Sequence, residues 1–215
     1  ARFGYSTQMS INCRCLHNLP FSTYKAARTF YPHHYKHMVN KSKFYFSNKE
    51  IAFLAAFFVL LLADNFIWAL GPMVGNVVYG VVEGIILIVA SIVIGKKYTM
   101  ITLGFVRTLA EFIIAGAFVG SLTAFSYIIC AVFLEVILMT YNPYGESLKI
   151  NVIGSAVYGI ISRIVFLGVS MTFYGMVLPN SLLAFMVIVP TISFAIGGLI
   201  GTSFGKKTKK ILFSV

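Results

Sequence analysis

From Glu50 onward the sequence is an almost continuous run of apolar residues, interrupted only by short polar turns. Across all 215 residues, 59% are hydrophobic and 11% are charged. A water-soluble domain carries about 25% charged residues, so this composition excludes an ordinary soluble fold. A transmembrane helix needs about 20 apolar residues, which leaves room for about six spans. We therefore predict an all-α, multi-pass protein of the cell membrane, built as a bundle of six transmembrane helices.

Short breaks divide the apolar part into helices. Ser47 and Glu50 have the spacing of a capping box, and Gly71-Pro72 ends one helix and begins the next. The run 98–141 would be about 66 Å long as a single helix, twice a bilayer core, so it holds two helices with a reversal at 115–117 or 120–121. The predicted helices cover about residues 47–69, 72–95, 98–141 as a pair, 147–178 and 181–205.

A polar arm precedes the apolar part of the chain. Residues 1–49 hold eight of the 17 basic residues and all four histidines, but no acidic residue. We expect three parts: a basic polar arm over 1–46, a transmembrane domain over 47–205 and a basic tail over 206–215. Met38 opens a short basic leader and is a candidate native start. No cleavable signal peptide is predicted, because the first apolar run is too long.

The basic residues predict the orientation of the bundle. With six spans, the arm, the Lys96-Lys97 turn, the segment around Lys149 and the tail from Lys206 all lie on one side of the membrane. The other turns carry no lysine or arginine. By the positive-inside rule, both termini are cytoplasmic. The positive charge is therefore interpreted as an orientation signal, and no nucleic-acid partner is expected.

Five charged residues are candidates to lie inside the bilayer, where each one needs a partner because a charge near the bilayer centre costs a few kcal/mol. They are Glu83, Arg107, Glu111, Glu135 and Arg163. Arg107 and Glu111 are four residues apart and can pair on one helix face. Arg163 with Glu135 is interpreted either as a structural pair or as a functional one. Glu83 and Glu111 are the stronger functional candidates.

A ligand pocket is predicted in the external half of the bundle. Asn76, Tyr79 and Glu83 recur at helical spacing along one stripe, and Glu111 lies in the same half. Aromatic rings beside carboxylates suit a flat, nitrogen-rich or cationic small molecule. The candidate substrate-binding residues are Asp64, Asn65, Trp68, Asn76, Tyr79, Glu83, Glu111 and Tyr174. Trp68 alone is equally well interpreted as an anchor at the membrane interface.

The last helix carries a ridge of small residues. Ser193, Gly197, Gly201 and Gly205 recur every four residues, which lets another helix approach closely. Such ridges are common in multi-pass proteins. We expect this ridge to pack within the chain.

Catalytic chemistry is not predicted. All four histidines lie in the arm, so the apolar part has no Ser-His pair and no His-ligated metal site, and the chain has no phosphate-binding loop. Cys13 and Cys15 with His17 make a weak metal candidate, because a spacing of one residue lacks the usual gap between ligands. We expect no enzyme activity, no cofactor and no metal, and energy supplied by a gradient or a partner.

The region from about 46 to 210 resembles the S components of energy-coupling factor transporters. The resemblance rests on six helices in about 165 residues, an external first turn with Trp68, the alanines of 52–56, and the ending SFAIGGLIG followed by GKK. It implies a small-molecule binding subunit that docks, through Ala52 and Ala56, on a transmembrane coupling protein driven by two ATPase subunits. The branch that handles thiamine and its hydroxymethylpyrimidine precursor is the most similar, which implies contacts from Trp68, Tyr79, Glu83 and Glu111 to a pyrimidine.

Two other function classes fit the same composition. One is a non-transporting subunit of a larger membrane complex, in which the small-residue ridges serve assembly and the charges are only paired. The other is a self-sufficient carrier, although helices one to three and four to six lack the similar polar spacing of an inverted repeat. A bound small molecule after purification would favour the binding subunit over the assembly subunit.

Overall fold

The computed structural model describes residues 45–115 and 121–213, and every regular element within them is helical. The predicted all-α class is therefore confirmed for this part of the chain, and the residues from Phe46 onward form one compact unit. In chain order the elements are α2 (Asn48–Ala63), the 3-10 helix η2 (Asp64–Leu70), α3 (Pro72–Ile94), α4 (Thr99–Ala115), the 3-10 helix η3 (Ser121–Ala124), α5 (Phe125–Met139), α6 (Leu148–Phe173) and α7 (Asn180–Phe213).

Five helical stretches in the described residues are long and apolar enough to cross a membrane. They are Asn48–Ile67, Val74–Ile94, Leu122–Met139, Leu148–Phe173 and Asn180–Leu212. The remaining described α-helix, α4, has 17 residues. These lengths and compositions are those of a multi-pass membrane protein.

Local sequence signals set several helix ends. The predicted capping box is confirmed: Ser47 N donates to Glu50 Oε2 (2.7 Å), and Glu50 N donates to Ser47 Oγ (3.4 Å). Gly71 takes a φ of +90° just before Pro72 begins α3. Gly95 ends α3 with a φ of +64°, a left-handed conformation that glycine adopts without strain.

The first and fifth predicted helices end earlier than expected. α2 stops at Ala63, and the chain continues to Leu70 as a 3-10 helix, the tighter form that commonly finishes an α-helix. α6 stops at Phe173 because Gly175 turns the chain with a φ of +63°. A break between the third and fourth predicted helices is confirmed, since α4 ends at Ala115 and η3 begins at Ser121. Most of the residues at which the reversal was predicted lie within 116–120, outside the described part.

The last helix extends beyond its predicted end. α7 continues through Gly205 to Phe213, so most of the expected basic tail is helical. Lysine is a good helix former, and positive charge is favoured at a helix C-terminus, so the lysines prolong the helix. Gly205 does not end the helix but packs closely against α3, since a Cβ there would meet the Ile92 side chain at 2.9 Å.

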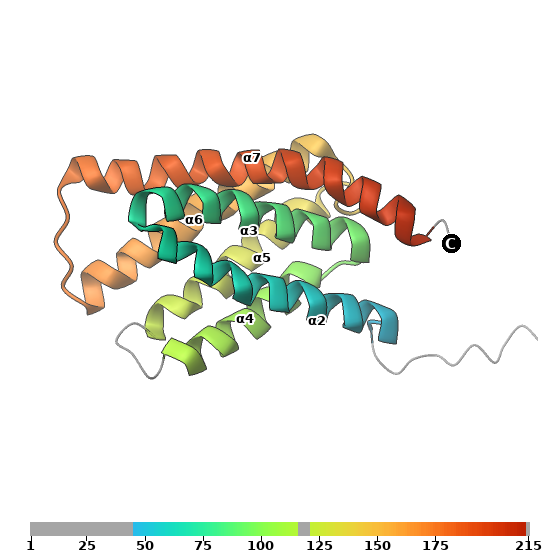
Figure 1. Cartoon of the computed structure of the whole chain (residues 1–215), viewed down its shortest axis with the longest axis horizontal. Helices are drawn as coiled ribbons and strands as arrows, with labels where there is room; N and C mark the ends of the chain where they lie inside the picture. Colours follow the sequence, from blue (N-terminus) through green and yellow to red (C-terminus); the bar gives the residue numbers. More distant parts are fainter. Residues whose placement is uncertain (1–44, 116–120, 214–215) are drawn as a thin grey trace, which may run out of the picture. The chain divides into compact units, whose positions relative to one another are not determined.

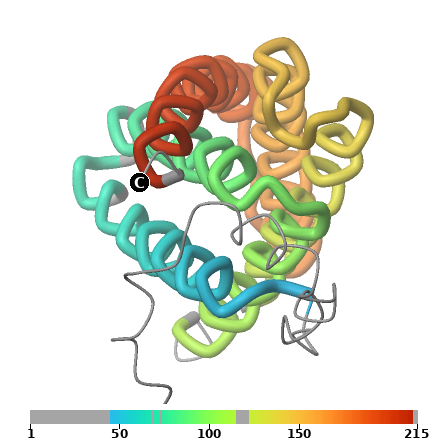
Figure 2. The backbone as a smooth tube through the Cα atoms, turned by 90° about the vertical axis from the view of Figure 1, so that its right-hand side faces the viewer, coloured from blue at the N-terminus to red at the C-terminus, as the bar shows by residue number. Residues whose placement is uncertain are grey.

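The other helices are arranged around α3 through a small set of helix–helix contacts. α7 runs alongside α3 and α6, α5 packs against α4 and α6, and α2 contacts α3 and α4 (Figure 1). Seen end-on in Figure 2, α2 and α7 lie on opposite sides of α3. As a result, α3 is the most buried of the candidate spans: 67% of the residues in an apolar stretch of 18 are buried inside the protein.

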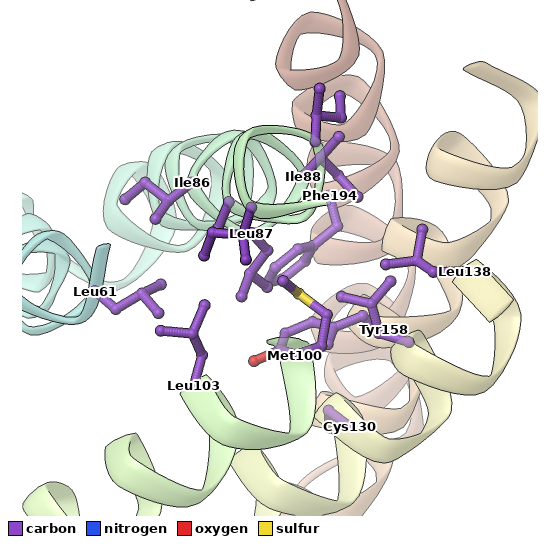
Figure 3. Packing of buried hydrophobic residues seen from close by; sticks show 14 of the residues in the cluster. Leu61, Ile86, Leu87, Ile88, Met100, Leu103, Cys130, Leu138, Tyr158 and Phe194 are labelled. Carbon is purple, nitrogen blue, oxygen red and sulfur yellow. The ribbon is translucent and has the colours of Figure 1, made fainter. Parts of the chain in front are cut away.

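Buried side chains from each of the six α-helices in the described residues form one hydrophobic core. Figure 3 shows Leu61 of α2, Ile88 of α3, Met100 of α4, Leu138 of α5 and residues of α6 and α7 converging on the same region. The ring centroids of Tyr158 on α6 and Phe194 on α7 lie 5.4 Å apart. This core fixes the helix packing on which the polar groups described below depend.

Two ion pairs lie at the same end of the bundle. Lys96, in the turn between α3 and α4, pairs with Glu50 at the start of α2 (2.7 Å). Lys209, near the end of α7, pairs with Glu146 in the turn between α5 and α6 (2.8 Å). A Cβ placed on Gly95 would lie 3.7 Å from Lys209 Nζ. The start of α2, both turns and the end of α7 are therefore neighbours.

Small residues line the contact between α3 and α7. A Cβ placed on Gly84 would lie 3.2 Å from the Gly197 Cα, and one placed on Gly201 would lie 3.0 Å from the backbone of α3. The two backbones therefore approach as closely as small-residue ridges allow. The ridge predicted from Ser193, Gly197, Gly201 and Gly205 packs within the chain, as expected.

Replacing Gly197 with alanine is expected to destabilise the protein by about 1–3 kcal/mol, because the new methyl group would lie against the backbone of α3 and force the helices apart. The added Cβ would lie 3.0 Å from the Gly84 Cα. Thermal unfolding in detergent measures the effect. Gly168→Ala is the matched control, because Gly168 is exposed on α6 and a Cβ there meets nothing within 4 Å. Equal melting temperatures for the two variants would contradict the tight α3–α7 contact.

Candidate functional site

Arg107 lies at the centre of a buried polar cluster. Its Nη1 donates to Glu83 Oε1 at 2.5 Å, and its Nη2 donates to Asp64 Oδ1 at 3.1 Å and to the Tyr79 hydroxyl at 2.8 Å. The Tyr158 hydroxyl also donates to Glu83 Oε1, at 3.0 Å. The side chains of both carboxylates and of Arg107 are at most 1% exposed. These five residues, which we call the Arg107 cluster, join η2, α3, α4 and α6.

The position of each element explains how the cluster forms. Asp64 begins η2 at the end of α2, Tyr79 and Glu83 stand one turn apart on α3, and Arg107 lies in the middle of α4. The ring of Tyr127 on α5 lies 4.2 Å from the guanidinium carbon of Arg107, a cation–π contact. The cluster therefore links distant parts of the sequence with charge-assisted hydrogen bonds.

The predicted pairing of Arg107 with Glu111 is wrong. Arg107 is directed toward α3 and η2, and Glu111 instead accepts a hydrogen bond from Asn65 Nδ2. Helical spacing places the two residues on one face, but two carboxylates from neighbouring elements compete successfully for the guanidinium. A buried guanidinium with two carboxylates is better compensated than one with a half-exposed carboxylate.

Glu135 has a structural role at the opposite end of α4. Its carboxylate accepts hydrogen bonds from Tyr98 N (2.7 Å), Met100 N (2.9 Å) and the Tyr144 hydroxyl (2.8 Å). Two free amides at the start of α4 are thereby satisfied by a negative charge, which a helix N-terminus favours. These contacts account for the burial of Glu135, which was predicted as a partner of Arg163.

A cavity of about 360 Å³ lies beside the Arg107 cluster. This volume falls in the range of small-molecule sites, roughly 300–1,000 Å³. Its polar lining residues are Asn76, Tyr79, Thr123, Ser126, Tyr127, Ser162 and Arg163. Its apolar lining residues are Phe166, Leu167, Met176 and Met186. The lining therefore comes from α3, η3, α5, α6, the segment after α6 and α7, and it combines a few polar groups with aromatic and aliphatic surface.

Tyr79 belongs to both the cavity and the cluster. Its hydroxyl accepts from Arg107, and its side chain lines the cavity. Arg163, which also lines the cavity, has its guanidinium carbon 6.0 Å from the centre of the Tyr79 ring. Asn76, one turn before Tyr79, has a buried Oδ1 without a hydrogen-bond partner in the described structure. The carboxamide oxygen thus offers an acceptor at the cavity wall.

The predicted substrate-binding residues divide into three groups. Asn76 and Tyr79 line the cavity. Asp64 and Glu83 bind Arg107, and Asn65 and Glu111 bind each other, so these four contribute to the neighbouring polar network. Tyr174 is half-buried just after α6, and the side chain of Trp68 lies outside the described part.

Sequence reasoning missed most of the cavity lining on α5 and α6. Ser126 and Tyr127 follow Thr123 at helical spacing, and Ser162 precedes Arg163. Small hydroxyl residues are common inside membrane helices, where they bond to their own backbone, so their pattern alone carries little information. The useful signal was the presence of Arg163 in an apolar helix.

The predicted docking residues lie on the surface. Ala52 and Ala56 are exposed on α2, together with Ala55. In the candidate span that contains α2, 17% of the residues in an apolar stretch of 18 are buried. The two alanines are one turn apart, so they share a helix face free for a partner helix or lipid.

No group of three or more acidic, histidine or cysteine side chains in the described residues is placed to hold a metal ion. The weak candidate formed by Cys13, Cys15 and His17 lies outside these residues. Comparisons with protein-family models, with curated proteins and with solved structures find no match to this chain.

Proposed function

We propose that this chain is the membrane-embedded substrate-binding subunit of an uptake system for a small vitamin-like or pyrimidine-containing molecule. The observation that carries this proposal is the cavity, which lies within apolar helices and is lined by aromatic, hydroxyl, amide and guanidinium groups. A packed assembly subunit has no need of such a space, because protein interiors are otherwise filled to crystal-like density. Transport would be energised by a coupling subunit and two ATPase subunits, as in the S components that the sequence resembles.

The lining does not favour the cationic ligand that the sequence allowed as one alternative. Acidic residues are not among the described lining residues, since Asp64 and Glu83 face Arg107. Arg163 and the hydroxyl groups offer donors, and Asn76 Oδ1 offers an acceptor. The rings of Tyr79 and Phe166 suit a flat ring. The ligand is therefore a small, flat molecule with both acceptors and a donor, bound in its neutral or anionic form.

A panel of water-soluble vitamins and their pyrimidine precursors tests this proposal on the purified protein. Ligand that occupies the cavity at about 100 times its Kd stabilises the folded state by about 2.7 kcal/mol, which raises the melting temperature by several degrees. Binding by at least one member, confirmed by isothermal titration calorimetry, supports the proposal. The assembly-subunit alternative predicts no response to any member.

Six spans with both termini in the cytoplasm fit this function. α4 would reach about 26 Å, close to the roughly 30 Å of a bilayer core, so it is long enough to cross together with its flanking residues. The pairs Lys96–Glu50 and Lys209–Glu146 join the start of α2 to the end of α7 through neighbouring turns, which supports an even number of crossings. The basic residues at this end favour the cytoplasm.

Labelling is expected to bear out this topology. A cytoplasm-sensing reporter fused after Val215 should be active, and a cysteine placed at Asn180, the first residue of α7, should react with an impermeant reagent added from outside. The single buried Cys130 in the described part is not expected to react. Labelling of the Asn180 position from the cytoplasmic side alone would reverse the orientation.

Bulky residues on the exposed face of α2 should uncouple transport from binding. In Ala52→Trp/Ala56→Trp, two indole rings would hold a partner helix away, whereas the cavity, lined by other helices, is untouched. Uptake and co-purification with a coupling subunit should be lost, while ligand affinity stays within about twofold, a change of roughly 0.4 kcal/mol. Ala184→Trp, at an exposed alanine of α7, is the control. Normal uptake by the double variant would contradict docking through α2.

A further inference from the structure

The Arg107 cluster contains more negative than positive groups. Asp64 and Glu83 both bind the one guanidinium of Arg107, and all three side chains are at most 1% exposed. Asp64 Oδ2 and Glu83 Oε2 are also buried and have no hydrogen-bond partner in the described structure. One carboxylate oxygen on each side of Arg107 is therefore left without a donor.

The surroundings do not change this balance. Around the Arg107 cluster as a whole, the titratable and charged groups in the described residues are Tyr79 and Glu83 of α3, Arg107 and Glu111 of α4, Tyr127 and Cys130 of α5, and Tyr158 and Arg163 of α6. Tyrosines and cysteines are neutral at neutral pH. Counting Glu111 and Arg163 gives three carboxyl groups and two guanidinium groups, so one carboxyl group remains in excess.

An excess charge in this setting is strongly disfavoured. A buried carboxylate without its own counter-charge is less stable than the neutral acid, and the group takes up a proton instead. We infer that the Arg107 cluster is a proton-binding site, which holds one proton between its two carboxyl groups in the folded protein at neutral pH.

The hydrogen bonds indicate which carboxyl group carries the proton. Glu83 Oε1 accepts two hydrogen bonds, at 2.5 Å from Arg107 and 3.0 Å from Tyr158, whereas Asp64 Oδ1 accepts one, at 3.1 Å from Arg107. More and shorter donors favour the ionised form. Glu83 is therefore the carboxylate that pairs with Arg107, and Asp64 carries the proton on Oδ2.

The site borders the cavity through Tyr79. The tyrosine hydroxyl bonds to Arg107, and its side chain lines the cavity, so Arg107 and Tyr79 connect the protonated Asp64 to the cavity wall. Intramembrane acids next to a substrate site are a common arrangement for proton binding in transport proteins. The proton site itself does not depend on the cavity being occupied.

Asp64 is the single aspartate in the sequence, so isotope labelling can report on it alone. The protein is made by cell-free synthesis with aspartate carrying ¹³C in its side-chain carboxyl group, and infrared spectra of labelled and unlabelled ligand-free protein are subtracted at neutral pH. The expected isotope-sensitive band is the C=O stretch of a protonated carboxylic acid, which shifts further in D₂O. Isotope-sensitive carboxylate stretches in its place would overturn the inference.

A variant and an ion exchange sharpen the test. In Glu83→Gln, Arg107 keeps Asp64 as its remaining carboxylate partner, so the labelled group should ionise and its acid band should be replaced by carboxylate bands. An acid band unchanged in Glu83→Gln would overturn the sharing of one proton. Exchange of sodium for potassium should leave the wild-type spectrum unchanged. Carboxylate bands that appear only in sodium would indicate that a bound cation takes the place of the proton, and this result would overturn the inference.

Discussion

Replacing Arg107 with leucine is expected to prevent the protein from accumulating in a folded form. The change leaves the carboxylate of Glu83, whose side chain is 1% exposed, buried without its counter-charge, and it removes the donor to Asp64. Removing one partner of a buried ion pair costs about 3–5 kcal/mol, a large share of the stability of a domain. Fluorescence-detected size-exclusion chromatography of detergent extracts should show loss of the monodisperse peak.

Two controls separate the charge from other effects of this substitution. Lys97→Leu also removes a basic residue, but from an exposed turn, and should leave the peak unchanged. Asp64→Asn/Glu83→Gln/Arg107→Leu removes the guanidinium group together with both carboxyl groups and should recover much of the folded protein, since uncharged buried groups carry a smaller desolvation cost. An Arg107→Leu variant as stable as the wild type would show that the Arg107 cluster does not hold these helices together.

Filling the cavity is expected to abolish ligand binding. Ser126 on α5 lines the cavity and is 5% exposed, so a phenyl ring in Ser126→Phe would occupy space that the ligand needs. Affinity for a ligand found with the vitamin panel should fall at least about 100-fold, which is roughly 2.7 kcal/mol. Isothermal titration calorimetry measures the loss.

The ligand-free melting temperature shows whether this loss arises from the cavity or from unfolding. Ser126→Phe should stay within a few degrees of the wild type, because the ring enters empty space. Ser203→Phe places the same ring on an exposed position of α7 and should bind normally. Wild-type affinity in Ser126→Phe, with the protein folded, would move the binding site elsewhere.

Local signals predicted much of the fold. The capping box of Ser47 and Glu50, the break at Gly71 and the left-handed end of α3 at Gly95 each depend on residues within a few positions, so the sequence carries them directly. The end of α7 was predicted less well. Glycine often caps a helix, but at Gly205 it permits close packing on α3, and this depends on a distant helix.

The partners of the charged residues could not be predicted for the same reason. Arg107 and Glu111 have the spacing of an intrahelical pair, yet Arg107 binds Asp64 and Glu83 from elements 43 and 24 residues away. Spacing along one helix says nothing about which neighbouring helix faces it. Glu135 likewise caps the start of α4 from the adjacent helix α5.

The candidate site was predicted in part. The stripe along α3 correctly placed Asn76 and Tyr79 on one face, and both line the cavity. Glu83 lies on the same stripe, but one further turn carries it into the Arg107 cluster. The sequence allowed a nitrogen-rich or a cationic ligand, and the cationic alternative rested on these carboxylates, of which Glu83 is paired with Arg107.

Native mass spectrometry of the protein released gently from its own membranes tests the central claim most directly. The cavity of about 360 Å³ predicts that part of the wild-type protein carries one small molecule, seen as a discrete added mass that collisional activation removes. The same preparation of folded Ser126→Phe should lack this mass, and Ser203→Phe should retain it. An added mass present equally in Ser126→Phe, or a wild-type protein that carries none and takes up none from the vitamin panel, would contradict a small-molecule binding subunit.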